Sequence, residues 1–290
     1  MEKTIRVGSR DSRLAVAQAE FVCHALGGCT LVTMKTTGDM VLDKTLDQVG
    51  GKGLFVKELD QALAEGRVDL TVHSLKDVPM EQPDGLPLLA FPKREDARDA
   101  LVLPEGGAWD KTKPIGCSSA RRRVQLAALF PEIEVKPVRG NVQTRLSKLD
   151  GGAYGALVLA AAGLRRLGLE SRISRYFSPD EMLPAAGQGI LAVQGRADEW
   201  TEAVRLLDDA DARDCARAER AFVKALDGGC FAPVAAYAEV DGETLRLRGL
   251  YASADEKTVV RGELSGARAA AETLGQTLAV QLREQAEGKR

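Results

Sequence analysis

The sequence has few aromatic residues, few histidines and almost no net charge, and each shortage excludes a class of function. Aromatic residues make up 4% of the 290 residues, too few for the stacking platforms that bind single-stranded nucleic acids. The formal net charge is −2, so no general affinity for nucleic acid is expected. With only two histidines and no CxxC spacing, the sequence predicts no metal site.

Disulfides, a signal peptide and membrane-spanning segments are not expected either. The cysteines are odd in number and lack CxxC spacing, which is typical of reduced thiols; they are Cys23, Cys29, Cys117, Cys215 and Cys230. The longest apolar run, Ala156 to Leu164, is far shorter than the roughly 20 residues that cross a bilayer. The N-terminal residues are charged and lack the apolar core of a signal peptide, so we expect a cytoplasmic protein.

What the sequence does contain is an alternation of short apolar strands with amphipathic helices. This alternation predicts largely parallel sheets covered by helices on both faces. A charged run between Pro92 and Arg98 separates two groups of such elements, and a second break follows Asp209. The residues after this break predict a helix, three alternating strands and a final helix. We therefore expect two similar α/β domains and a smaller C-terminal α+β domain with a three-stranded sheet.

The segment Val68 to Pro79, VDLTVHSLKDVP, is the most informative part of the chain. Its period-2 alternation predicts a buried strand, and Pro79 prevents the strand from continuing. Lys76 and Asp77 therefore follow the carboxyl end of a strand, where open α/β sheets bind ligands. An ammonium beside a carboxylate at such a place predicts a site for cation or proton chemistry.

Arginines recur where predicted strands lead into helices. Arg10 and Ser12 lie at the first such junction, and Ser12 is placed to cap the following helix. Ser118 and Ser119 can cap a later helix, and Arg121 and Arg122 occupy its first turn, where cations oppose the helix dipole unless an anion faces them. Arg139 and Arg145 flank a third junction, which Asn141 is placed to cap. Three such junctions predict one ligand with several carboxylates or phosphates.

Two glycine-rich segments remain. The run Gly50 to Phe55, GGKGLF, places Lys52 at a loop-to-helix turn but lacks P-loop spacing, and no GxGxxG occurs, so nucleotide binding is not predicted. Gly228 and Gly229 precede Cys230 on a predicted open turn. Spacing alone does not distinguish a functional Cys230 from an inert buried thiol.

Eight segments, in this order, resemble the porphobilinogen deaminase family: GSRDSRLA, VGGKGLFVKEL, VDLTVHSLKDVP, SSARRR, RGNVQTRLSKLD, AAGLRRLGL, LPAAGQG and DGGCFAP. The resemblance spans Gly8 to Pro233. It implies a transferase that condenses four porphobilinogen molecules into the linear tetrapyrrole hydroxymethylbilane and releases ammonia at each step. The family works on a covalent dipyrromethane cofactor held through a cysteine thioether, and it serves tetrapyrrole biosynthesis of the haem type. A monomer that binds no metal, membrane or nucleic acid is implied.

The resemblance assigns a role to each notable residue. Asp77 would be the catalytic group that stabilises cationic intermediates and moves protons, and Cys230 would carry the cofactor. The remaining cofactor-binding residues would be Lys76, Asp77, Ser119, Arg121, Arg122 and Arg139. The substrate-binding residues would be Arg10, Ser12, Lys52, Phe55, Arg145 and Arg166.

The resemblance also implies three domains, the first two like the lobes of periplasmic solute-binding proteins. Their expected bounds are residues 1–93 with 189–209, residues 98–188, and residues 212–290. The chain departs from the family pattern at Gln48, where many relatives have lysine, at Gln194, in place of a usual glutamate, and at Ala235, in place of a glycine. Cys117, before a helix N-terminus among arginines, is a candidate second reactive thiol.

Two other functions fit the same residues. A carboxylate-binding protein without catalytic activity would use the same two lobes and cationic cleft. A Schiff-base enzyme would use Lys76 as its nucleophile, because an amine beside a carboxylate at a strand end suits that chemistry.

Overall fold

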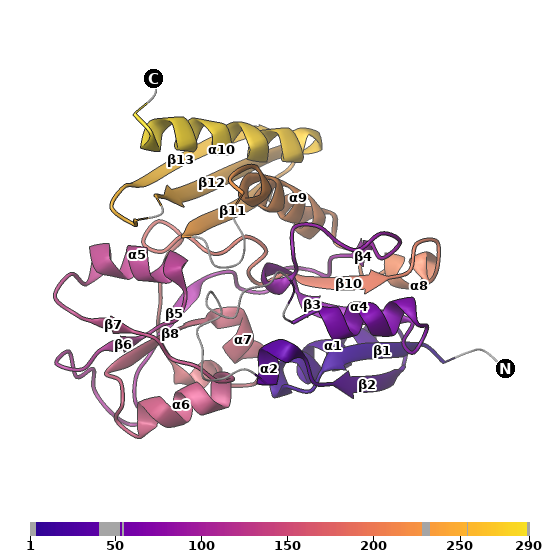
Figure 1. Cartoon of the computed structure of the whole chain (residues 1–290), viewed down its shortest axis with the longest axis horizontal. Helices are drawn as coiled ribbons and strands as arrows, with labels where there is room; N and C mark the ends of the chain where they lie inside the picture. Colours follow the sequence, from indigo (N-terminus) through magenta and orange to yellow (C-terminus); the bar gives the residue numbers. More distant parts are fainter. Residues whose placement is uncertain (1–3, 41–52, 54, 228–232, 254, 289–290) are drawn as a thin grey trace.

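The computed structural model describes residues 4–40, 53, 55–227, 233–253 and 255–288, and its strands form three separate sheets (Figure 1). The sequence predictions that concern Gln48, Lys52 and Cys230 lie outside the described residues. No helix in the described ranges combines the length and apolar character needed to cross a membrane.

The first sheet forms one lobe, at the right of Figure 1. Its order is β2 (Thr30–Met34), β1 (Arg6–Arg10), β3 (Leu70–Ser74), β10 (Leu191–Gly195) and β4 (Leu88–Ala90). β1 runs parallel to β2 and β3, whereas β10 runs antiparallel to β3 and β4. Helices α1 (Arg13–Ala25) and α4 (Lys57–Ala64) pack against this sheet, and the short helices are α2 (Thr37–Met40) and α8 (Thr201–Arg205).

The second sheet forms the other lobe and repeats the same plan. Its order is β7 (Val135–Lys136), β6 (Ile115–Gly116), β8 (Ala156–Ala160), β5 (Asp99–Val102) and β9 (Ile173–Tyr176). β6 runs parallel to β7 and β8, and β5 runs antiparallel to β8 and β9. The helices of this lobe are α5 (Ala120–Leu129), α6 (Val142–Asp150), α7 (Ala161–Arg166) and the 3₁₀ turn η2 (Glu170–Arg172).

Each of these sheets is therefore largely parallel, as the alternation of strands and helices predicts, but contains one reversed strand, β10 in the first lobe and β5 in the second. The exceptions are strands that begin where the chain crosses between the lobes. In register, Asp99 at the start of β5 lies opposite Ala160 at the end of β8, and Leu191 at the start of β10 lies opposite Ser74 at the end of β3. A strand that enters a lobe at the carboxyl ends of its parallel strands must run in the opposite direction.

The two crossing segments touch each other between the lobes. The Glu95 amide donates to the Gly189 carbonyl at 3.1 Å. Gly189 has a φ of +88°, and a Cβ at this position would lie 2.3 Å from the Glu95 carbonyl oxygen. Only glycine supplies both the positive φ and the close approach, so the LPAAGQG segment is built for this contact.

The third sheet, at the top of Figure 1, contains β11 (Val234–Asp241), β12 (Thr244–Ala252) and β13 (Val259–Ala267) in antiparallel order. Helices α9 (Ala210–Ala225) and α10 (Ala271–Ala286) pack against it, with the 3₁₀ turn η3 (Arg268–Ala270) between sheet and helix. Its core is continuous with the first lobe through Leu75, Phe91 and Ile190. A second contact joins Val124 and Leu183 of the second lobe to β11 and β12. The third unit thus packs against both lobes.

One sequence prediction about cysteine is wrong, because Cys23 and Cys29 form a disulfide. Cys23 lies near the end of α1, and Gly27 and Gly28, both at positive φ, reverse the chain toward β2. The reversal brings the two Cα atoms to 5.2 Å, within the usual range for a disulfide. Counting cysteines does not reveal a pair that a tight turn creates. Cys117 and Cys215 are free and buried.

Candidate functional site

The VDLTVHSLKDVP segment forms the predicted buried strand and ends in a tight turn. Residues Leu70–Ser74 are strand β3, and the 3₁₀ turn η1 (Leu75–Asp77) follows directly. The buried side chains of Leu75 and Val78 anchor the turn in the core, and the Leu75 amide donates to the Ile190 carbonyl at 3.0 Å. Lys76 and Asp77 are therefore presented on a fixed turn at the carboxyl end of the strand.

Lys76 lies among charged groups of both lobes. Its Nζ donates to the Gln188 side-chain oxygen at 3.4 Å. Burial lowers the pKa of the Lys76 ammonium to about 8; the Asp77 carboxylate opposes this shift, and the cationic Arg122 adds to it. Lys76 is therefore charged at neutral pH but close to losing its proton.

Asp77 faces residues of the first lobe across a small cavity of about 20 Å³. Arg10, Phe55 and His73 also line this cavity, so the structure brings the predicted site residues Asp77, Arg10 and Phe55 together. The Arg10 guanidinium lies 4.3 Å from the centre of the Phe55 ring. Within the described part of the chain, no hydrogen bond occupies the Asp77 carboxylate.

The predicted caps are present at all three strand-to-helix junctions. The Ser12 hydroxyl accepts from the Ala15 amide at 3.4 Å, and Ser119 accepts from the Arg122 amide at 3.4 Å. The Asn141 side chain accepts from the Thr144 amide at 2.9 Å. Capping explains the polar residues at these positions without any ligand, so only the arginines at these junctions indicate a bound ligand.

Arg121 and Arg122 are buried and share an anion that belongs to the protein itself. Each guanidinium lies 2.7 Å from a carboxylate oxygen of Asp99, which is completely buried at the start of β5. Burial alone would raise the pKa of Asp99, but the two arginines hold it well below its usual range. The anion expected in front of the α5 N-terminus is therefore Asp99, which sequence reasoning missed. The sequence did contain a signal for this role, because Asp99 is the first residue of the otherwise apolar, fully buried strand DALV. A buried carboxylate requires partners of opposite charge.

Arg145 lies close to the positive charges of Arg122 and Arg139. The Arg145 Nε donates to the Gly140 carbonyl at 2.8 Å. Burial lowers the pKa of Arg145, and repulsion by Arg122 and Arg139 lowers it further, whereas Asp77 of the other lobe opposes the shift. The arginines of the second lobe are therefore within electrostatic reach of one another and of the Asp77 turn.

Arg166 completes this group from the end of α7. One of its terminal nitrogens donates to the Gly189 carbonyl at 2.7 Å, and burial lowers its pKa to about 10. Cations from α5 and α6 thus lie within electrostatic reach of the Lys76–Asp77 turn, and Arg166 of α7 contacts the segment that crosses between the lobes at Gly189. Concentrated positive charge of this kind suits a ligand with several carboxylates.

Gln188 is a second buried residue that sequence reasoning missed. Its side-chain nitrogen donates to the Ala97 carbonyl at 2.6 Å and to Asp99 at 3.0 Å, and its oxygen accepts from Lys76. One amide thus connects the Lys76 turn with the anion that holds Arg121 and Arg122. Gly187 and Gly189, on either side of Gln188, indicate an unusual backbone conformation in the sequence. They do not indicate which groups the Gln188 side chain contacts.

The remaining predicted features lie in the core. Gln194 is buried on β10, where its side-chain oxygen lies 3.0 Å from His73 Nε2; burial lowers the His73 pKa to about 4. Ala235 is fully buried on β11, and Cys117 is only 3% exposed, which limits its access to reagents. No group of three or more His, Cys, Asp and Glu side chains in the described residues could hold a metal ion.

Comparison with known proteins decides the family. Residues 5–203 match the family model described as the dipyromethane cofactor binding domain of porphobilinogen deaminase, and residues 214–284 match its C-terminal domain. The chain belongs to the porphobilinogen deaminase family. A porphobilinogen deaminase of Ruminiclostridium cellulolyticum is 57% identical over 86% of this chain and 87% of its own length. That of Acetivibrio thermocellus is 53% identical over 96% of this chain and 97% of its own length.

Among solved structures, the chain is similar to an ABC transporter protein from Parabacteroides distasonis. The TM-score is 0.43 and the identity 13%, over 100% of this chain and 96% of that one. The family models also assign the cofactor-binding part of a porphobilinogen deaminase to the two lobes, which contain all the described site residues. A member of this family is an enzyme of tetrapyrrole biosynthesis that uses a dipyrromethane cofactor.

Proposed function

We propose that this protein condenses porphobilinogen into hydroxymethylbilane and that Asp77 is its catalytic residue. The observation that carries the proposal is the position of the Lys76–Asp77 turn. It lies at the carboxyl end of β3, within electrostatic reach of Arg122 and Arg145 from the opposite lobe. A carboxylate among so many cations can stabilise a cationic intermediate while the arginines bind the carboxylates of the substrate.

The residues at the site fit a dipyrromethane with its four carboxylate arms. Arg145 lies among other cations, and their mutual repulsion falls when anions lie between them. Lys76, Ser119, Arg121, Arg122 and Arg139 would hold the carboxylates of the cofactor, and Cys230 would form the thioether. When bound, the dipyrromethane supplies a pyrrole α-carbon that is free to attack the next activated ring.

Asp77 and its neighbours supply the remaining steps. As ammonia leaves porphobilinogen, positive charge develops on the ring, and the Asp77 carboxylate stabilises this charge. The same carboxylate then accepts the proton released when the new bond between rings restores the pyrrole. Arg10, Ser12, Lys52, Phe55, Arg145 and Arg166 would bind and orient the incoming ring.

The two other functions considered from the sequence are not favoured. A Schiff-base enzyme would use Lys76 as its nucleophile, but the family models and the curated relatives match porphobilinogen deaminases over most of the chain. A carboxylate-binding protein without activity would not need a carboxylate at the centre of a cationic cleft, because Asp77 would repel its ligand.

The first test is the intact mass of the purified active enzyme. We expect a mass above that of the sequence by one dipyrromethane, with the adduct on Cys230 in a peptide map. Cys117 provides an internal control, because it is buried and should be unmodified. An unmodified chain with full activity, or an adduct on another cysteine, would contradict the assignment of Cys230.

The second test replaces Asp77 with asparagine, which keeps the shape and removes the charge. Turnover should fall by at least about 100-fold, the scale for loss of a key electrostatic or acid-base group, while the bound cofactor remains. Asp84→Asn is the matched control, because Asp84 is exposed and loses the same charge. Equal activity of the two variants would show that Asp77 is not catalytic.

We also propose that the enzyme acts as a monomer in the cytoplasm. The proposal comes from the family resemblance and from the sequence. Size-exclusion chromatography with light scattering, and fractionation of the source cells, would test its two parts separately.

A further inference from the structure

A second cavity, separate from the one beside Asp77, lies between the first lobe and the second. Its volume is about 580 Å³, within the range of about 300–1,000 Å³ that is usual for small-molecule sites. Arg13, at the start of α1, comes from the first lobe, and the other lining residues come from α6 and the segment after α7. None of the residues assigned to catalysis or cofactor binding lines it.

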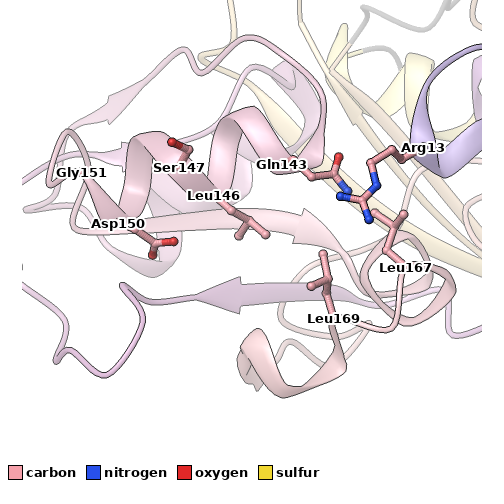
Figure 2. Close-up of a pocket in the computed structure, with 8 residues that line it drawn as sticks. All are labelled: Arg13, Gln143, Leu146, Ser147, Asp150, Gly151, Leu167 and Leu169. Atoms are coloured by element: carbon pink, nitrogen blue, oxygen red, sulfur yellow. The ribbon is translucent and has the colours of Figure 1, made fainter.

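The cavity has two polar ends with an apolar middle, as Figure 2 shows. Arg13 and Gln143 lie at one end with their polar groups toward each other, and neither side chain has a hydrogen-bond partner among the described residues. The side chains of Leu146 and Leu169 lie in the middle, and Leu167 lies beside Arg13. At the other end lie Ser147 and Asp150.

The two polar ends of the cavity differ in whether the charge there is already neutralised by an ion pair within the protein. Asp150 is paired with Arg172, whose terminal nitrogen lies 2.7 Å from its Oδ1, so this end is close to neutral while keeping acceptor capacity. Arg13 forms no ion pair with a described residue and leaves the opposite end cationic. The cavity therefore suits a ligand with a carboxylate at one end, an apolar ring in the middle and a hydrogen-bond donor at the other end.

We propose that this cavity is an outer subsite that receives one porphobilinogen molecule before it enters the catalytic site, a proposal that rests on the proposed function. Porphobilinogen combines carboxylate arms, a flat pyrrole ring and an aminomethyl group. The aminomethyl group is lost as ammonia when a ring joins the chain, so the acceptors at the Asp150 end favour the free monomer over the growing chain. The cavity also adjoins the predicted substrate site, since Arg13 follows Ser12 and Leu167 follows Arg166.

The test compares steady-state kinetics of the holoenzyme with those of three variants. Arg13→Glu reverses the unmatched charge, and Ser147→Phe fills the cavity without changing charge. Arg205→Glu is the matched control, because Arg205 is 73% exposed and, within the described ranges, its ion-pair partner is Glu202 of its own short helix. All three substituted positions lie outside the catalytic and cofactor-binding residues assigned above.

In Arg13→Glu, KM for porphobilinogen should rise about tenfold with little change in kcat, the loss expected for one charge-assisted contact. Ser147→Phe should also raise KM, and the double variant should be no worse than Arg13→Glu alone, because both changes remove one subsite. Native mass spectrometry should still show the same enzyme-bound intermediates, since the catalytic site is intact. Arg205→Glu should keep the wild-type KM.

Two results would overturn the subsite. One is a wild-type KM in both Arg13→Glu and Ser147→Phe, provided that circular dichroism shows both variants folded. The other is an equal rise of KM in Arg13→Glu and Arg205→Glu, which would indicate a general effect of charge on substrate approach. Either result leaves the proposed function intact, whereas failure of the wild-type enzyme to convert porphobilinogen would contradict the proposed function itself.

Discussion

Asp99 organises the charged residues of the site, although it has no place among the predicted ligands. Its two carboxylate oxygens bind Arg121 and Arg122, and its Oδ1 also accepts from Gln188, which in turn contacts Lys76. Arg121 also donates to the Leu183 carbonyl and Arg122 to the Val158 carbonyl, so only their remaining donor groups are available to a cofactor. Five guanidinium N–H groups per arginine make this double use possible.

We expect Asp99→Asn to lower the free energy of unfolding by about 3–5 kcal/mol, because it leaves two buried guanidinium groups without their anion. Chemical denaturation of wild type and variant measures this difference. Glu202→Gln is the control, since Glu202 and its partner Arg205 are 88% and 73% exposed and such a pair contributes at most about 1 kcal/mol. A loss in Asp99→Asn no larger than in the control would show that the arginines are stable without Asp99.

The lowered pKa of Lys76 predicts an alkaline limit to activity. Below about pH 8 Lys76 carries the charge that binds carboxylates, and above it the charge is lost, so kcat/KM should fall as pH rises through about 8. Lys76→Arg keeps its charge at all these pH values, and its profile should lack this limb. An unchanged limb in Lys76→Arg would assign the titration to another group.

Among the elements, α1 is fixed at both ends. Ser12 caps its first turn beside the site, and the Cys23–Cys29 disulfide ties its last turn to the start of β2. The helix carries Arg13 at its first position and Gln18 on its buried face, where the Gln18 amide donates to the Ser74 hydroxyl at 2.9 Å. Because α1 is held at both ends, Ser12 and Arg13 at its N-terminus are held in place as well.

Reduction of this disulfide should lower the free energy of unfolding by about 2 kcal/mol, the chain-entropy value for so short a loop. Denaturation with and without reductant measures the change, and intact mass after thiol alkylation shows whether the bond has been reduced. The double variant Cys23→Ser, Cys29→Ser should be insensitive to reductant. Two alkylated thiols at these positions in the protein as purified would show that the bond does not form in solution.

In the whole molecule, one buried ion pair joins all three sheet-containing units. Arg94 lies on the segment that crosses between the lobes, and its Nη1 is 2.6 Å from the Glu219 carboxylate of α9. Glu219 also accepts from the amides of Gly187 and Ala238, and Arg94 donates to the Gln188 carbonyl. The third unit thus holds both crossing segments in place, directly behind the Lys76 turn.

Glu219→Ala should destabilise the protein by about 3–5 kcal/mol and separate the unfolding of the third unit from that of the lobes, because Arg94 loses its buried partner. Denaturation followed by fluorescence and by circular dichroism should then give transitions that no longer coincide. Glu272→Ala is the control, since Glu272 is 57% exposed in its pair with Arg217. Coincident transitions and a small loss in Glu219→Ala would show that apolar packing alone holds the units together.

Local patterns determined much of the fold and one part of the site. Period-2 alternation identified β3, capping residues identified the starts of α1, α5 and α6, and Pro79 placed Lys76 and Asp77 beyond the strand. These features depend on residues near one another in sequence, so a single stretch contains the information. The resemblance carried by the eight motifs then indicated the family.

Tertiary structure alone decided the reversed strands, the disulfide and the partners of the buried charges. The register of β5 and β10 depends on where the chain enters each lobe, and the Cys23–Cys29 bond depends on a turn built by Gly27 and Gly28. Asp99 and Arg121 lie 22 positions apart in the sequence, and Arg94 and Glu219 lie 125 positions apart. A charged residue in a buried segment of the sequence predicts that it has a partner of opposite charge. Which residue is that partner depends on the tertiary structure, because only folding brings distant residues into contact.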